Sequence, residues 1–208
     1  MQKVKAFIFD IGGVVVKYTD KPVQGILSSL LNISHEKFDE EFTKIRKLLS
    51  LDEISEDEAW EIFLESIDRE FEVEQIKKTY REQTIEYLTI NNLIDHKVLD
   101  LIDSLKVKGY KIGALANTTC INTDIYTKLG IYKHFDSMIL SNEVKMKKPD
   151  PKIFALALQK LNLSPQQVIF IDDLPHQVEA ARNLGINSIL YTSYENLISE
   201  INNLNIIL

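Results

Sequence analysis

Residues 4–13 read VKAFIFDIGG, an apolar run that ends at Asp10 and is followed at once by two glycines. Such a run, ended by a turn, predicts a buried β-strand over residues 4–9. Similar apolar runs cover residues 110–116, 168–171 and 188–191, and a weaker one covers residues 137–140. Strands that are apolar on both faces are typical of a parallel sheet with helices covering both sides.

Helical patterns separate these runs in the second half of the chain. A cap at Asp95 begins a helix that stops before Gly109, and Asp150 followed by Pro151 begins another. A third helical pattern stops at Gly185. Because strands alternate with helices, the sequence predicts an α/β fold with a doubly wound parallel sheet.

Residues 17–88 lack strand patterns and carry 10 basic against 18 acidic residues. A capping box at Ser55 precedes apolar residues at helical spacing. We therefore predict an inserted α-helical cap domain over residues 17–88. The Rossmann-like core would then consist of residues 1–16 and 89–208.

Composition excludes several classes of protein. The 208 residues carry a net charge of −7, which argues against a nucleic-acid-binding surface. The apolar runs are too short to span a membrane, and no signal-peptide cleavage pattern follows the first one. Cys120 is the only cysteine, so an internal disulfide is impossible. We expect a cytoplasmic protein, either a monomer or a homodimer, that binds neither nucleic acid nor membrane.

Polar residues follow the predicted strands at the carboxyl edge of the sheet, where α/β proteins bind their ligands. These residues are Asp10, Asn117, Asp172 and Asp173, and Lys148 follows the weak strand. Converging carboxylates repel one another unless a divalent cation neutralises them, and an all-oxygen set of ligands suits Mg²⁺. A nearby lysine would balance a substrate phosphate, and a carboxylate can attack phosphorus.

Three motifs resemble those of the haloacid dehalogenase superfamily in their order and spacing. They are FIFDIGGV at 7–14, KPDP at 148–151 and FIDD at 170–173. The helical insert after the first motif resembles the cap domain of the phosphatase-rich branch of that superfamily. The resemblance implies a hydrolase with a Rossmann-like core, a helical cap and a bound Mg²⁺.

The resemblance also implies roles for single residues. Asp10 would be the nucleophile and a Mg²⁺ ligand. Asp173, the carbonyl of Gly12 and, in the first or second coordination shell, Asp172 would complete the metal site. Lys148 would pair with the substrate phosphate and with Asp10. The backbone N–H groups around Ala116 and Asn117 would hold phosphate oxygens.

Two departures from the family pattern bear on catalysis. The family usually has a second aspartate, a general acid and base, two residues after the nucleophile, and this sequence has Gly12. The hydroxyl residue that usually ends the second strand is replaced by Ala116. Glycine at the first of these positions also occurs in phosphatase-like members that resemble sugar-phosphate phosphatases.

The sequence therefore predicts a Mg²⁺-dependent phosphomonoesterase that acts on a small phosphorylated metabolite, such as a sugar phosphate, through an aspartyl phosphate. Gly12 and Ala116 leave open a catalytically weak or inactive protein that binds phosphate without turnover. A third interpretation is a 2-haloacid dehalogenase, which needs a carboxylate nucleophile but no metal. The adjacent pair Asp172 and Asp173 argues against it, because dehalogenases of this fold lack such a metal-binding pair.

Overall fold

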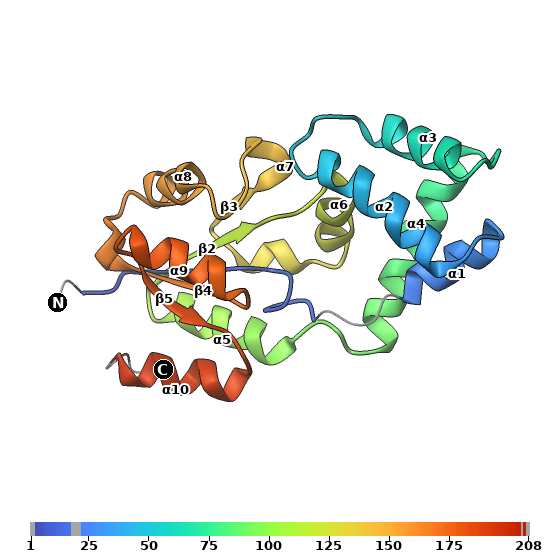
Figure 1. The fold of residues 1–208 in the computed structure, drawn as a ribbon. Coiled ribbons are helices and arrows are strands. Elements are labelled where there is room, and N and C mark those ends of the chain that lie inside the picture. The colour runs from blue at the N-terminus through green and yellow to red at the C-terminus, as the bar shows by residue number, and fades with distance from the viewer. Residues whose placement is uncertain (1–2, 18–21, 205, 207–208) are drawn as a thin grey trace.

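A computed structural model describes residues 3–17, 22–204 and 206 of the chain. Its five strands form one parallel sheet in the order β3-β2-β1-β4-β5 (Figure 1). The strands are β1 (Ala6–Phe9), β2 (Lys111–Ala116), β3 (Ser137–Leu140), β4 (Val168–Asp172) and β5 (Asn187–Leu190). The predicted α/β fold with a doubly wound parallel sheet is confirmed, and each predicted strand is present with its ends shifted by at most two residues.

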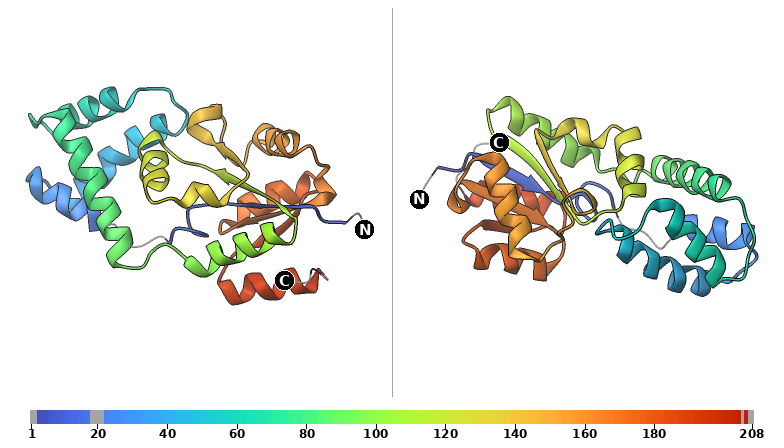
Figure 2. Two further views of the ribbon diagram at one scale, coloured as in Figure 1. Left: turned by 180° about the vertical axis from the view of Figure 1, so that it is seen from behind. Right: turned by 90° about the horizontal axis from the view of Figure 1, so that it is seen from above.

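Helices cover both faces of the sheet, as the apolar strands require (Figures 1 and 2). Phe7 and Phe9 of β1 belong to a buried cluster that includes residues of α5 and α10, whereas Ala6 and Ile8 belong to a second cluster that includes residues of α8 and α9. The core helices are α5 (His96–Val107), α6 (Cys120–Lys128), α7 (Ser141–Val144), α8 (Pro151–Leu161), α9 (Pro175–Asn183) and α10 (Tyr194–Asn203). Two 3₁₀ turns, Ile131–His134 and Pro165–Gln167, precede β3 and β4.

The register of the sheet brings distant parts of the sequence to one edge. Phe9 pairs with Ala114 of β2 and with Ile171 of β4. The N–H of Asp10 then donates to the carbonyl of Ile171 at 2.8 Å. The residues that follow β1 and β4 therefore lie side by side at the carboxyl edge.

A separate helical unit follows β1 and lies beside the core (Figure 2). Its helices are α1 (Pro22–Leu30), α2 (His35–Leu49), α3 (Glu56–Ser66) and α4 (Val73–Ile90). Ser55 and Glu58 form the predicted capping box at the start of α3. Aromatic rings of α2, α3 and α4 pack against one another in its interior, namely Phe38, Phe42, Trp60, Phe63 and Tyr80.

The last helix of this unit ends at Ile90, slightly past the predicted boundary at residue 88. Residues 18–21, which fall within the predicted insert, lie outside the described residues. The division into a core and a cap domain remains a prediction.

Two chain segments connect the helical unit to the core, and they pair with each other. Val16 forms an antiparallel bridge with Ile94, and the N–H of Asp95 donates to the carbonyl of Val15 at 2.8 Å. The side chains of Lys17 and Asp95 form an ion pair at 3.1 Å. The described ends of the two connecting segments, at residues 15–17 and 94–95, therefore form a short paired ribbon.

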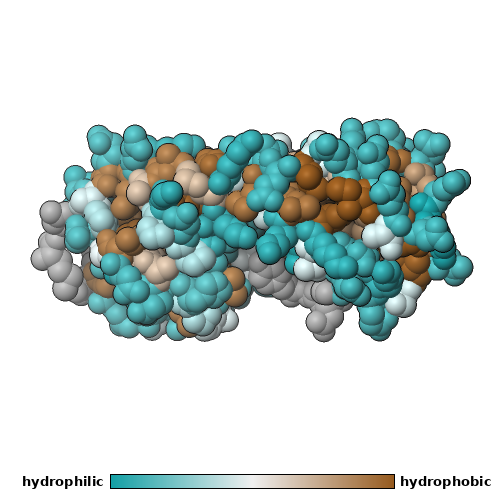
Figure 3. All heavy atoms as spheres, turned by 45° about the horizontal axis from the view of Figure 1, so that its top comes forward, coloured by the Kyte–Doolittle hydropathy of each residue, from teal (hydrophilic) through white to brown (hydrophobic). Residues whose placement is uncertain are grey.

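One buried apolar cluster extends from β1 into all four helices of the helical unit. At the surface, apolar side chains form a band that crosses the junction of the two units (Figure 3). The buried apolar contacts between the two units add to the stability of the whole molecule. No helix among the described residues has the length and apolar character that crossing a membrane requires.

Candidate active site

Asp10 lies at the end of β1 with only 6% of its surface exposed. Its Oδ1 accepts a hydrogen bond from the N–H of Ile11 at 2.7 Å, and its own N–H is bound to Ile171. The backbone on both sides therefore fixes the carboxylate at the strand end. A buried carboxylate that is held in place in this way is suited to act as a nucleophile or a metal ligand.

Asp172 and Asp173 follow from β4 and have different surroundings. Asp172 is fully buried, and its Oδ1 accepts a hydrogen bond from the N–H of Leu174 at 2.9 Å. Asp173 is less buried, but its Oδ1 atom is inaccessible and has no hydrogen-bond partner among the described residues. A buried carboxylate oxygen without a partner is costly unless something binds it.

Lys148 lies between two of these carboxylates. Its Nζ is 3.0 Å from Asp10 Oδ1 and 2.6 Å from Asp172 Oδ2, and the residue is 2% exposed. The ammonium group also lies 5.4 Å from the centre of the Phe170 ring. Burial of a lysine is tolerated here because its charge is paired twice.

Asn117 at the end of β2 positions this lysine through the backbone. The Nδ2 of Asn117 donates to the carbonyl of Lys148 at 2.9 Å, and the N–H of Lys148 donates to Asn117 Oδ1 at 2.8 Å. Ala116 precedes it as the last, buried residue of β2. The sequence motifs indicated a place near phosphate for Asn117, but they did not indicate this contact.

Ser141 is a residue of the site that the sequence analysis missed. Its Oγ accepts from the N–H of Thr118 and donates to the carbonyl of Thr118, both at 2.9 Å, and it is fully buried. It holds the loop after β2 against the end of β3. Its position directly after a predicted strand is the signal that could have revealed it.

The electrostatics of the cluster favour a bound cation. Burial raises the pKa of Asp10 to about 6, Lys148 counteracts this rise, and Asp172 adds to it. Burial, together with the charge of Asp172, also raises the pKa of Asp173. Three carboxylates thus lie around one ammonium group, and a divalent cation would offset the excess negative charge.

The geometry fits such an ion. One oxygen from each of Asp10, Asp172 and Asp173 lies within 4.8 Å of the others. Asp173 has an oxygen without a hydrogen-bond partner among the described residues, whereas both oxygens of Asp172 already accept hydrogen bonds. Asp10 and Asp173 are therefore better placed to bind a cation directly. Gly12 follows Asp10 by two residues in the loop after β1, where it forms a bridge with Val16.

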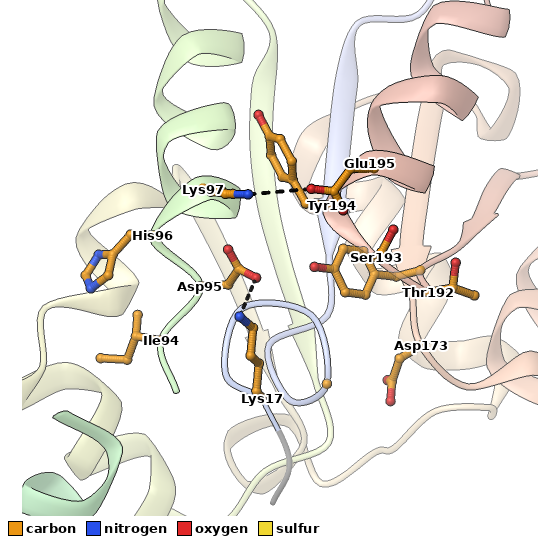
Figure 4. A pocket seen from close by; sticks show the side chains of 12 residues that line it. Lys17, Ile94, Asp95, His96, Lys97, Asp173, Thr192, Ser193, Tyr194 and Glu195 are labelled. Carbon is orange, nitrogen blue, oxygen red and sulfur yellow. Dashed lines mark hydrogen bonds and ion pairs between the residues drawn. The ribbon is translucent and has the colours of Figure 1, made fainter. Parts of the chain in front are cut away.

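Gly13 makes room for Asp173. It has a left-handed conformation (φ +79°), and a Cβ atom there would overlap the Asp173 carboxylate. A cavity of about 650 Å³ lies next to these two residues (Figure 4). Its other walls come from the connecting ribbon, the end of β5 and the first turns of α5 and α10, with Lys17, Asp95, Lys97, Tyr191, Ser193 and Glu195 among the lining residues.

The helical unit contacts the core through ion pairs. Arg81 of α4 binds Glu56 through both terminal nitrogens and Asp124 of α6 through Nε, each at 2.6 Å. Asp52, in the loop before α3, pairs with Lys145 at 3.1 Å. Sequence patterns do not predict such long-range pairs.

The fold and the site together define a class of hydrolase-like proteins. Its features are a parallel α/β sheet, a buried carboxylate–lysine cluster at the carboxyl edge, and a helical unit inserted after β1. Residues 7–191 match the model of the haloacid dehalogenase-like hydrolase family. The chain belongs to this family, as the sequence motifs indicated.

Curated relatives include phosphatases. The chain is 30% identical over 138 residues to a phosphorylated carbohydrates phosphatase of Thermotoga maritima, with 65% of this chain and 63% of that protein covered. It is 35% identical over 89 residues to the pyrophosphatase PpaX of Bacillus velezensis, with 42% and 41% covered. The matches therefore span less than two thirds of either relative.

Solved structures share the fold. A haloacid dehalogenase family enzyme of Bacteroides thetaiotaomicron, crystallised as a magnesium complex, superposes with a TM-score of 0.79. The identity is 21%, and the superposition covers 95% of this chain and 99% of the other. This likeness establishes the common fold of the two proteins.

Proposed function

We propose that the protein is a Mg²⁺-dependent phosphomonoesterase that acts on a small phosphorylated metabolite, such as a sugar phosphate. The observation that supports this proposal is the cluster of Asp10, Asp172 and Asp173 around Lys148 at one edge of the sheet. The phosphatase names of the curated relatives agree with it.

The residues present fit Mg²⁺. Asp10 and Asp173 would hold the ion, with the carbonyl of Gly12 as a further oxygen ligand and Asp172 close by. When bound, the ion supplies positive charge that offsets the carboxylates and attracts the substrate phosphate. Lys148 adds a fixed positive charge on the same side as Asp10.

The reaction would proceed in two displacements at phosphorus. An oxygen of Asp10 attacks phosphorus, the bond from phosphorus to the leaving oxygen breaks, and the electron pair departs with that oxygen. Water then attacks the aspartyl phosphate, which releases inorganic phosphate and restores the Asp10 carboxylate. Lys148 holds Asp10 in place during both displacements, and the N–H groups near Ala116 and Asn117 would bind phosphate oxygens.

Replacement of the nucleophile tests this proposal. Asp10→Asn preserves the shape of the side chain but removes its nucleophilic charge, so phosphate release from a panel of sugar phosphates, nucleotides and acyl phosphates should fall to background. Asp100→Asn, at an exposed position of α5, is the matched control and should match the wild type. Wild-type rates for Asp10→Asn would contradict the mechanism.

A second candidate function is binding of a phosphorylated ligand without turnover, which Gly12 and Ala116 favour. It predicts that inorganic phosphate with Mg²⁺ raises the melting temperature while no panel substrate is hydrolysed. Measured turnover that depends on Asp10 would exclude it. Dehalogenation of a 2-haloacid that survives EDTA would instead favour the dehalogenase interpretation.

A further inference from the structure

The loop that follows Asp10 offers no proton donor. It consists of Ile-Gly-Gly-Val-Val-Val at residues 11–16, and its isoleucine and valines are buried. The next residue, Lys17, is bound to Asp95. A leaving oxygen that departs from a phosphate on Asp10 therefore finds no acid on this segment.

Other groups near the sheet edge that can carry a proton include a lysine, a thiol and two histidines. The ammonium of Lys148 binds two carboxylates, and Asp10 itself is the attacking group. Burial raises the pKa of the Cys120 thiol, which makes it an even weaker acid. His176 lies on the exposed face at the start of α9, and His96 lies across the cavity from Asp173 (Figure 4).

Carboxylates of the helical unit that approach the core are bound to cations. Both oxygens of Glu56 accept from Arg81 at 2.6 Å, and Asp52 pairs with Lys145 at 3.1 Å. A carboxylate bound to a cation is an acceptor and has no proton to donate. Neither Glu56 nor Asp52 is therefore placed to protonate a leaving group in the site.

This arrangement decides which phosphates can react quickly. General acid catalysis typically contributes ~10²–10⁴-fold to a rate by protonating the leaving group. Without it, the electron pair of the broken phosphorus–oxygen bond must stay on the leaving oxygen until water protonates it. That is fast only if the leaving group is a weak base.

We propose that the physiological substrate is a phosphate with an acidic leaving group, such as an acyl phosphate or the ester of an acidic hydroxyl. This inference rests on the proposed phosphatase function. In the overall reaction, water supplies the oxygen that phosphate gains and the proton that the leaving group takes up.

Position 12 is the place to test this inference. Ile11 is buried in the core, and a side chain at position 13 would overlap Asp173, so Gly12 is the remaining position in this turn for an added acid. Gly12→Asp adds a carboxyl group two residues after Asp10, in the loop that follows β1. Gly12→Asn adds a group of the same shape that cannot serve as an acid.

The experiment compares kcat/KM for aryl phosphates of graded leaving-group acidity with kcat/KM for simple alkyl phosphates. The wild type should cleave nitrophenyl phosphate at least ~10²-fold faster than alkyl phosphates. Gly12→Asp should raise the rate for alkyl phosphates by ~10²–10⁴-fold and change the nitrophenyl rate little, whereas Gly12→Asn should not. His176→Gln should leave the wild-type dependence unchanged. Melting temperatures and binding of inorganic phosphate confirm that each variant is folded.

Several results would overturn the inference. One is a wild type that cleaves aryl and alkyl phosphates equally well. A second is a Gly12→Asp variant whose kcat/KM depends on leaving-group acidity as strongly as that of the wild type. A third is an equal rise in the rate for alkyl phosphates in Gly12→Asp and Gly12→Asn. A fourth is a stronger dependence of kcat/KM on leaving-group acidity in His176→Gln. If the wild type hydrolyses no phosphate in the series, the proposed phosphatase function fails instead.

Discussion

Both the backbone conformation at position 13 and the placement of Asp173 depend on Gly13. Its positive φ of +79° is unfavourable for other residues, and its missing Cβ leaves the space that the Asp173 carboxylate occupies. Gly109 has a similar φ of +87°, but nothing lies within 4 Å of the place where its Cβ would be. An alanine at Gly109 would therefore lower stability only through its backbone conformation. An alanine at Gly13 would lower it through the conformation and also through overlap with Asp173.

Gly109→Ala should lower the free energy of unfolding by about 1–2 kcal/mol because only the left-handed conformation is penalised. Gly13→Ala should lower it further, and it should also weaken Mg²⁺ binding because Asp173 must move. Urea unfolding and calorimetric titration of Mg²⁺ measure the two effects. Equal stability losses with unchanged Mg²⁺ affinity would show that Asp173 does not need the space at Gly13.

The placement of Lys148 depends on contacts with other residues of the protein. Its ammonium group faces Asp10 because Asn117 holds its backbone on one side and Asp172 holds its side chain on the other. A lysine is long and flexible, so these contacts reduce the entropy cost of placing its charge. Asp172 therefore acts as an anchor for Lys148 as well as a source of negative charge.

At the scale of elements, α4 and α6 are joined by the ion pair of Arg81 and Asp124, which lies between the helical unit and the core. Arg81 also binds Glu56 at the start of α3, directly after the loop that carries Asp52. The ion pair thus connects the helical unit to α6. Because α6 begins directly after the loop at the end of β2, the orientation of the helical unit is linked to that loop. Such a pair contributes up to about 1 kcal/mol and is weakened by salt.

Asp124→Asn should therefore reduce kcat/KM a few-fold, mainly through KM, and should make it less sensitive to salt. Asp57→Asn is the matched control, because Asp57 pairs with Lys77 inside the helical unit, at 2.6 Å. Phosphatase assays over a range of ionic strength compare the two variants. A loss of the same size in both would assign the effect to the stability of the helical unit and not to its contact with the core.

Local features of the fold were predictable from the sequence, whereas long-range side-chain contacts were not. The strands, the helix starts at Asp95 and Asp150, and the convergence of Asp10 with Asp173 were predictable, because apolar period, caps and parallel topology are local or regular properties. The contact of Asn117 with Lys148 and the pairing of Arg81 with Asp124 were not. They join residues 31 and 43 positions apart, and their side-chain directions depend on packing that no sequence pattern encodes.

At the scale of the whole molecule, the site joins the first strand to the fourth, so a bound cation should stabilise the entire fold. Without the cation, the pKa of Asp10 is raised from 3.8 to about 6, which means that the folded state keeps a proton that the unfolded state has lost. The contribution of Asp10 to the free energy of unfolding therefore falls as pH rises from 3.8 to about 6. The ion binds the deprotonated carboxylate, so its stabilising effect should grow over this range.

Melting curves with MgCl₂ or EDTA, recorded at about pH 5 and about pH 7.5, test this coupling. The cation concentration is fixed at 100 times the Kd that applies at the higher pH, where the stabilisation should reach about 2.7 kcal/mol. At the lower pH the Kd is larger, so the same concentration should stabilise the protein less. Asp173→Asn should lose most of this shift, because it removes the carboxylate whose Oδ1 has no protein partner among the described residues. A Mg²⁺ shift that is independent of pH, or one that persists in Asp173→Asn, would place the ion elsewhere and remove the link between Asp10 and the metal.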